Sequence, residues 1–129
     1  MNTLEKEFAP YQESLELKEL GFDEPCFGSW ETDYVKLPTY THSISGFYKN
    51  SNHPIGKVTA PTFSQAFRWF REKYGLYSWI TMELGNKSTF CWVLSGEHTS
   101  TQYAAYFHTY EEAELACLRK LIEIVKNKN

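Results

Sequence analysis

Hydrophobic and polar positions follow two periods in the second half of the chain, and each period predicts a different element. Apolar side chains recur every three or four positions in residues 62–75 and again in residues 109–125, which is typical of amphipathic helices. Between these helices, apolar and polar side chains alternate, which is typical of strands, in residues 77–84, 89–94 and 102–110. The order predicted for residues 61–125 is therefore helix, strand, strand, strand, helix.

Both predicted helices begin with the spacing of a capping box. Thr62 precedes Gln65 and Thr109 precedes Glu112, so each hydroxyl can accept a hydrogen bond from a free backbone N–H of the first turn. In the earlier helix Trp69 lies at the edge of the apolar stripe, and the helix ends at Gly75. The stripe itself consists of Phe63, Ala66, Phe67, Phe70 and Tyr74.

The last helix has an apolar arc wider than one buried face requires. One stripe contains Ala113, Cys117, Leu121 and Ile124, and a neighbouring stripe contains Leu115, Leu118, Ile122 and Val125. A helix with a single buried face needs an apolar arc of only about 100°. We therefore expect the helix to pack on the sheet with one stripe, and on the N-terminal helix or another subunit with the other. Burial within the chain is favoured.

The first half of the chain predicts one helix and short strands. The helix begins near Pro10 and ends at Leu20, with Gly21 in the left-handed conformation and Phe22 folding back on Leu17. Strands are expected in residues 26–30 and 41–48, separated and followed by turn-rich segments that include residues 49–54.

These elements predict an α+β fold. Residues 61–129 are expected to form an αβββα core, in which two helices cover one face of a three-stranded antiparallel sheet. Residues 1–60 are expected to add the N-terminal helix and short strands, which can extend that sheet. We interpret residues 1–129 as a single domain, because no linker long enough to separate two domains is present.

The composition argues against broad anionic partners and favours recognition by aromatic rings. The 129-residue chain has a net charge of −3, which disfavours an extensive nucleic-acid or membrane surface. Aromatic residues make up 17%, more than a core of this size requires, so some rings should lie at the surface. An acidic N-terminus without an apolar run, and no segment of about 18 apolar residues, predict a cytoplasmic protein.

The residue types that carry catalysis or bind metals are scattered. Three cysteines form no closely spaced pair and are expected to be free thiols. His42, His53, His98 and His108 lack the spacing of a zinc site. Glu97 and His98 resemble an acid–base pair, but no nucleophile or oxyanion motif accompanies them. We therefore expect no cofactor and no metal, and an enzyme is disfavoured.

The sheet offers a better candidate site. If Ile80, Met82 and Leu84 face the core, Tyr77 and Trp79 face outward. Alternation leaves two choices on each neighbouring strand: Phe90 with Trp92 or Cys91 with Val93, and Tyr106 with His108 or Tyr103 with Phe107. The outward face is then covered by residues 26–48, forms a protein or oligomer interface, or lines a small-molecule pocket. The candidate binding residues are Tyr77, Trp79, Trp92 and Tyr106, with Arg68 and Arg71 from the exposed side of the earlier helix.

The αβββα order of residues 61–125 resembles the double-stranded-RNA-binding domain fold. That family binds phosphates with a basic cluster at the start of its last helix. Here the corresponding positions are Glu111, Glu112 and Glu114, which would repel phosphate. The resemblance therefore implies a topology, and we expect no binding to double-stranded RNA.

Three phrases resemble small uncharacterised proteins of phages and prophages of gut bacteria: PYQESLELKELGFDEPCFG (residues 10–28), APTFSQAFRWFREKYGL (residues 60–76) and YEEAELACLRKLIEIV (residues 110–125). The resemblance implies an accessory protein acting in the host cytoplasm on a host or phage component. We expect a non-enzymatic binding protein that engages a partner protein or associates with itself. The alternative is a binder that sequesters a nucleotide-like host defence signal.

Overall fold

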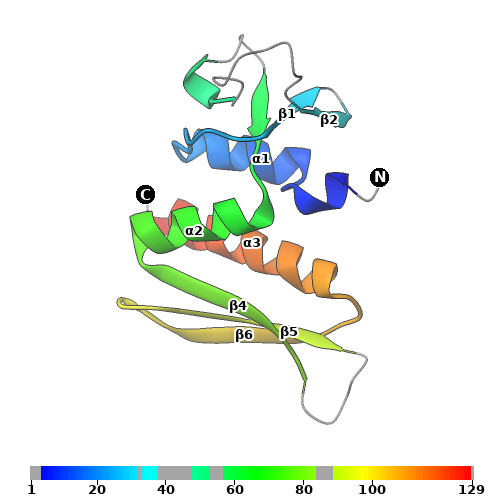
Figure 1. Ribbon diagram of the computed structural model, residues 1–129. Helices are drawn as coiled ribbons and strands as arrows, with labels where there is room; N and C mark the ends of the chain where they lie inside the picture. Colours follow the sequence, from blue (N-terminus) through cyan, green and yellow to red (C-terminus); the bar gives the residue numbers. More distant parts are fainter. Residues whose placement is uncertain (1–3, 32, 38–47, 53–56, 84–88, 129) are drawn as a thin grey trace. The chain divides into compact units, whose positions relative to one another are not determined.

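The order of helices and strands is that of an α+β protein, as predicted (Figure 1). The computed structural model describes residues 4–31, 33–37, 48–52, 57–83 and 89–128. The chain divides into two compact units, Met1–Gln65 and Ala66–Asn129. Each unit contains a three-stranded antiparallel sheet, β2-β1-β3 in the first and β4-β5-β6 in the second. The N-terminal strands therefore form a sheet of their own and do not extend the core sheet, which corrects that expectation.

Helix α1 (Tyr11–Glu19) ends as the sequence predicts. Gly21 has a φ of 100°, and its N–H donates to the Lys18 carbonyl at 3.0 Å. The N–H of Phe22 donates to the Leu17 carbonyl at 2.9 Å. These two bonds define a Schellman ending, and both Phe22 and Leu17 are buried beside it. The glycine is required because a side chain rarely adopts this φ.

The first sheet is built from three short strands, β1 (Gly28–Glu31), β2 (Tyr34–Lys36) and β3 (Val58–Ala60). Only β1 overlaps a predicted strand. Most of the strand expected at 41–48 lies outside the described residues, although Tyr48 pairs with Cys26 in an isolated bridge. A Cβ atom on Gly28 would lie 2.5 Å from Cγ1 of Val35, so close packing of β1 against β2 requires glycine there.

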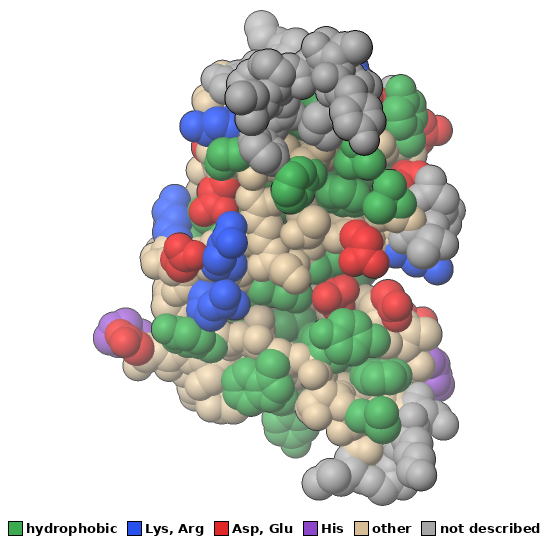
Figure 2. Space-filling model, viewed as in Figure 1, with side chains coloured by type: hydrophobic (Ala, Val, Ile, Leu, Met, Phe, Trp, Pro, Cys, Tyr) green, Lys and Arg blue, Asp and Glu red, His purple; other side chains and the backbone are tan. Residues whose placement is uncertain are grey.

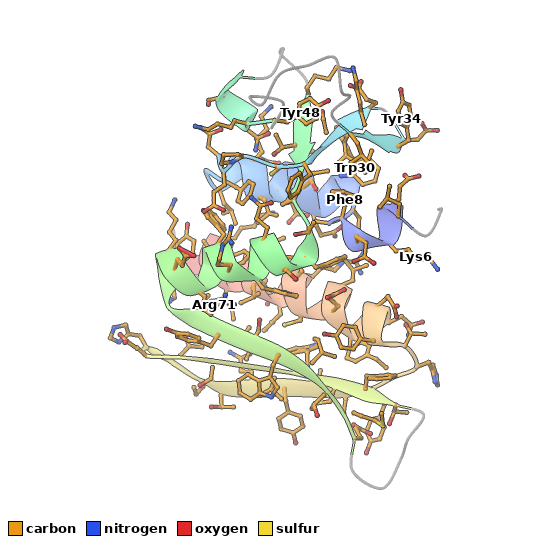
Figure 3. All side chains as sticks on the ribbon, viewed as in Figure 1. Lys6, Phe8, Trp30, Tyr34, Tyr48 and Arg71 are labelled. Atoms are coloured by element: carbon orange, nitrogen blue, oxygen red, sulfur yellow. The ribbon has the colours of Figure 1, made fainter. Side chains whose placement is uncertain are left out.

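Trp30 fixes α1 against this sheet. Its indole N–H lies 3.0 Å from the Ala9 carbonyl and 3.2 Å from the Ser14 hydroxyl, and both accept from it. Phe8 and Ala60 complete a small apolar cluster with the Trp30 ring. Figure 3 shows Phe8 and Trp30 lying close together in this unit.

Helix α2 (Phe63–Tyr74) begins at the predicted cap, but only half of the capping box forms. The Gln65 N–H donates to Oγ1 of Thr62 at 3.2 Å, whereas the Gln65 side chain donates to the Pro25 carbonyl at 2.7 Å. Trp69, at the edge of the predicted stripe, is buried, and it packs edge-on against Phe70. The Lys73 ammonium lies 5.1 Å from the centre of the Trp69 ring.

The second sheet consists of β4 (Leu76–Met82), β5 (Phe90–Gly96) and β6 (Thr99–Phe107). The turn expected at residues 85–87 lies outside the described residues. The loop expected at residues 95–101 is much shorter than predicted, because β5 extends to Gly96 and β6 begins at Thr99. Met82 is exposed despite the expectation that it faces the core, and Leu84 lies outside the described residues.

Helix α3 (Tyr110–Lys128) packs against all three strands of this sheet. Helices α2 and α3 lie on the same side of the sheet in Figure 1. Oγ1 of Thr109 accepts from the Glu112 N–H at 3.1 Å, which confirms the predicted cap. The wide apolar arc is also confirmed, because Leu118 and Ile122 are buried together with Leu121 within a single chain.

Candidate binding face

The register of β4, β5 and β6 determines which side chains lie on the sheet face opposite α3. Trp79 pairs with Val93, and Val93 pairs with Tyr103, so these three residues form one row across the sheet. Tyr77 pairs with Ser95 in the next row, and the Ser95 hydroxyl lies 3.2 Å from that of Thr101 on β6. We name the face carrying these residues the aromatic face.

Large and small side chains are segregated on the aromatic face. The edge strands carry exposed rings: Tyr77 is 51% exposed, Trp79 50% and Tyr103 72%. The central strand carries the smaller Val93 and Ser95, which are only partly exposed. Two aromatic sides thus flank a central strip of small side chains.

Within β4, β5 and β6 the aromatic face carries no charged side chain, but its outward row on β4 continues directly into Glu83. The Glu83 carboxylate accepts a hydrogen bond from the Thr89 hydroxyl at 2.7 Å at this end of the face. Its outward positions on β4 are Tyr77, Trp79 and Thr81, those on β5 are Cys91, Val93 and Ser95, and those on β6 are Thr101 and Tyr103. Its polar groups are hydroxyls and one indole N–H, all of which can donate hydrogen bonds. Figure 2 shows hydrophobic side chains at the surface over this sheet.

Tyr106 lies at an irregularity in β6. Trp92 pairs with Ala104 and Phe90 pairs with Phe107, so one intervening residue of β5 faces two of β6. At this bulge Tyr106 has a φ of 70°, a conformation that normally favours glycine, and its side chain is 74% exposed. The sequence singled out Tyr106 as a candidate but gave no sign of this backbone conformation.

Trp92 does not belong to the aromatic face. It pairs with Ile80, the residue after Trp79, and is therefore on the face that α3 covers. The side chain is only 6% exposed. On β5 the register places Cys91 and Val93 on the outward face, although Cys91 is buried there. On β6 neither predicted pair holds, because Tyr103 faces outward whereas Phe107 pairs with Phe90 on the opposite face. Tyr103 takes the place that the sequence analysis gave to Trp92.

Arg68 and Arg71 are exposed on α2, but they are not brought to the aromatic face. Helix α2 lies on the same side of the sheet as α3 (Figure 1). The register places Tyr77 and Trp79 on the opposite face of the sheet. Arg68 pairs with Glu72 one turn later at 3.4 Å, and Figure 3 marks Arg71 on the same helix. The six candidate residues are therefore not brought together. Tyr77 and Trp79 lie on the aromatic face and Tyr106 at the bulge of β6. Trp92 lies in the core, and Arg68 and Arg71 lie on the surface of α2.

The three cysteines are free and buried. Burial raises the pKa of Cys26 to about 12 and that of Cys117 to about 11, and it also raises the pKa of Cys91. All three thiols are therefore protonated at neutral pH, a state in which a thiol is a poor nucleophile. Within the described residues, no group of three or more His, Cys, Asp or Glu side chains is arranged to hold a metal ion.

Comparisons with known proteins add no relative: no family model, no curated protein and no solved structure matches this chain. Across the part of the chain that the structure describes, none of the helices combines the length and apolar character needed to cross a membrane.

Proposed function

We propose that this chain is a non-enzymatic accessory protein of a phage or prophage, and that it acts by binding a partner protein through the aromatic face. The observation that carries the proposal is the exposure of Tyr77, Trp79 and Tyr103 on one sheet face, which carries no charged side chain within β4, β5 and β6. Tyrosine and tryptophan are enriched at protein interfaces and charged residues are depleted at interface centres. At least half of the surface of each of these three rings is exposed, which suits binding to a partner better than packing in the core.

The phage context rests on the resemblance of three phrases to phage and prophage proteins, and it implies action in the host cytoplasm. The non-enzymatic assignment rests on the lack of a catalytic motif in the sequence and on the protonated state of the buried thiols. A nucleotide-like ligand would need cations beside the rings to bind its phosphates. Arg68 and Arg71 lie on α2 instead, so the arrangement favours the partner protein over the nucleotide.

Site-specific photo-crosslinking tests this proposal. A photoreactive amino acid is placed at position 79 or 103 of the full chain, in bacterial cells that express it. Position 34 is the matched control, because Tyr34 is 53% exposed but lies on β2 of the other sheet. We expect positions 79 and 103 to give the same crosslinked product and position 34 to give none.

The identity of the product separates two kinds of partner. A product with twice the mass of the chain identifies a second copy, and light scattering of the purified protein should then give a dimer mass. A product of any other constant mass identifies a different protein. If positions 79 and 103 give no more product than position 34, the aromatic face is not an interface and the proposal is wrong.

A further inference from the structure

We propose that the aromatic face binds an uncharged, proline-rich segment of its partner in the polyproline II conformation. This inference rests on the proposed function, since it specifies the chemistry of the partner at the same face. It follows from three observations on β4, β5 and β6: the spacing of the exposed rings, the lack of charge, and the kind of hydrogen-bonding groups present.

The spacing of the rings fits one extended chain. Trp79 on β4 and Tyr103 on β6 are separated by Val93 on the central strand. Neighbouring strands lie about 4.8 Å apart, so the two aromatic sides are about 10 Å apart. The strip between them presents only the small side chains of β5. A single extended peptide can lie along this strip with a ring on each side. A helix with its side chains is about 10–12 Å wide, so it would not fit between the two aromatic sides.

The chemistry of the face matches that of proline. A polyproline II segment has no internal hydrogen bonds, so its carbonyls are free acceptors, and proline itself has no N–H to donate. The face offers donors: the indole N–H of Trp79 and the hydroxyls of Tyr77, Tyr103 and Ser95. Within the described residues, the side chains of Tyr77, Trp79 and Tyr103 have no hydrogen-bond or ring partner, so these groups are available to a ligand.

The charge at this face argues against other extended ligands. Nucleic acids and phosphorylated or acidic segments are bound by clusters of Arg and Lys, and no Arg or Lys lies on the face within the described residues of β4, β5 and β6. The charged side chain next to it, Glu83, would repel such ligands. Aromatic-lined surfaces bind proline-rich segments because the ligand is already ordered and loses little entropy on binding.

Titration of the full chain with a synthetic polyproline peptide tests the inference, with a Gly-Ser peptide of equal length as the control ligand. Calorimetry should detect polyproline and not Gly-Ser. Backbone NMR shifts of the unsubstituted protein should map the site to β4, β5 and β6, so the location does not depend on any variant. Because no charge pair is involved, affinity should change little between low and high salt.

Substitutions then test both aromatic sides. Trp79→Ala and Tyr103→Ala should each weaken polyproline binding by about tenfold or more, while Tyr34→Ala leaves it unchanged. Three results would overturn the inference. The Gly-Ser peptide could bind as tightly as polyproline, or the NMR shift changes could fall outside the second sheet. Alternatively, only one of the two substitutions, Trp79→Ala or Tyr103→Ala, could weaken polyproline binding. If polyproline does not bind but crosslinking from positions 79 and 103 persists, this inference fails and the proposed function stands. If neither is seen, both fail.

Discussion

Trp79 and Trp92 lie on adjacent strands, one position apart in register, and on opposite faces of the same sheet. Trp79 pairs with Val93 and is half exposed, whereas Trp92 pairs with Ile80 and is buried under α3. A shift of one residue in register would exchange the two faces. The register thus separates a tryptophan that stabilises the fold from one that is free to bind.

This separation predicts opposite effects of the same substitution. Trp92→Ala should lower the free energy of unfolding by about 3–5 kcal/mol, because it removes a large buried side chain. Trp79→Ala should lower it by less than about 1 kcal/mol, as is usual for an exposed position. Urea unfolding of both variants measures the difference. A large loss of stability in Trp79→Ala would show that its ring is structural, against the proposed binding role.

The two buried stripes of α3 predict a stable monomeric core. Leu121→Ala should cost about 2–5 kcal/mol of unfolding free energy. Leu118→Asp should destabilise the chain at least as strongly, because it places a charge at a buried position without a partner. Unfolding curves and light scattering check both. If Leu118→Asp changes neither stability nor mass, the interpretation of two buried stripes is wrong.

The start of α3 predicts the absence of binding to double-stranded RNA. Glu111 and Glu112 are exposed in the first turn, where double-stranded-RNA-binding domains carry basic residues that bind phosphate. Affinity should be no better than non-specific, roughly 10⁻⁴ M or weaker, in a filter-binding assay at physiological salt. The double variant Glu111→Lys with Glu114→Lys should bind more tightly than the native chain. Micromolar binding by the native chain would contradict the prediction.

The buried thiols predict a loss of stability in alkali. Cys26 and Cys117 have pKa values of about 12 and about 11 in the folded chain, above their ordinary value of 9.0. Above pH 9 the unfolded chain therefore releases protons that the folded chain retains, so unfolding is favoured as pH rises towards the folded values. Each thiol should contribute a loss of about 1.4 kcal/mol per pH unit. Urea unfolding at increasing pH measures how steeply the unfolding free energy falls with pH, and Cys117→Ala should make this dependence shallower. A slope that is the same in this variant would contradict the assignment to the thiol.

The backbone of Tyr106 predicts a substitution that stabilises the fold. Its φ of 70° costs a residue with a Cβ atom about 1–2 kcal/mol. Tyr106→Gly relieves this strain, and the larger entropy of glycine in the unfolded chain offsets about 0.5–1 kcal/mol of the gain. We expect a net increase of up to about 1 kcal/mol in unfolding free energy, measured by urea. Tyr106→Ala, which keeps the Cβ atom, should show no such gain.

Local patterns predicted the helices better than they predicted the sheet faces. The end of α1 follows from Gly21 and Phe22 alone, because a Schellman ending depends only on neighbouring residues. The outward residues of β5 do not follow from alternation, since Phe90, Trp92 and Leu94 are apolar and so are the Cys91 and Val93 between them. The three-residue strands β2 and β3 are too short to show a period. The bulge at Tyr106 depends on pairing with β5, which no local pattern encodes.

The burial of all three cysteines also makes the chain suitable for site-specific labelling. Maleimide reagents react with thiolates, and at neutral pH the native thiols are both protonated and shielded from solvent. A cysteine introduced at an exposed position, as in Tyr34→Cys or Tyr77→Cys, would therefore react selectively with all native cysteines left in place. One such label in each unit, carrying a spin probe or a fluorophore, would give the distribution of distances between the two units in solution.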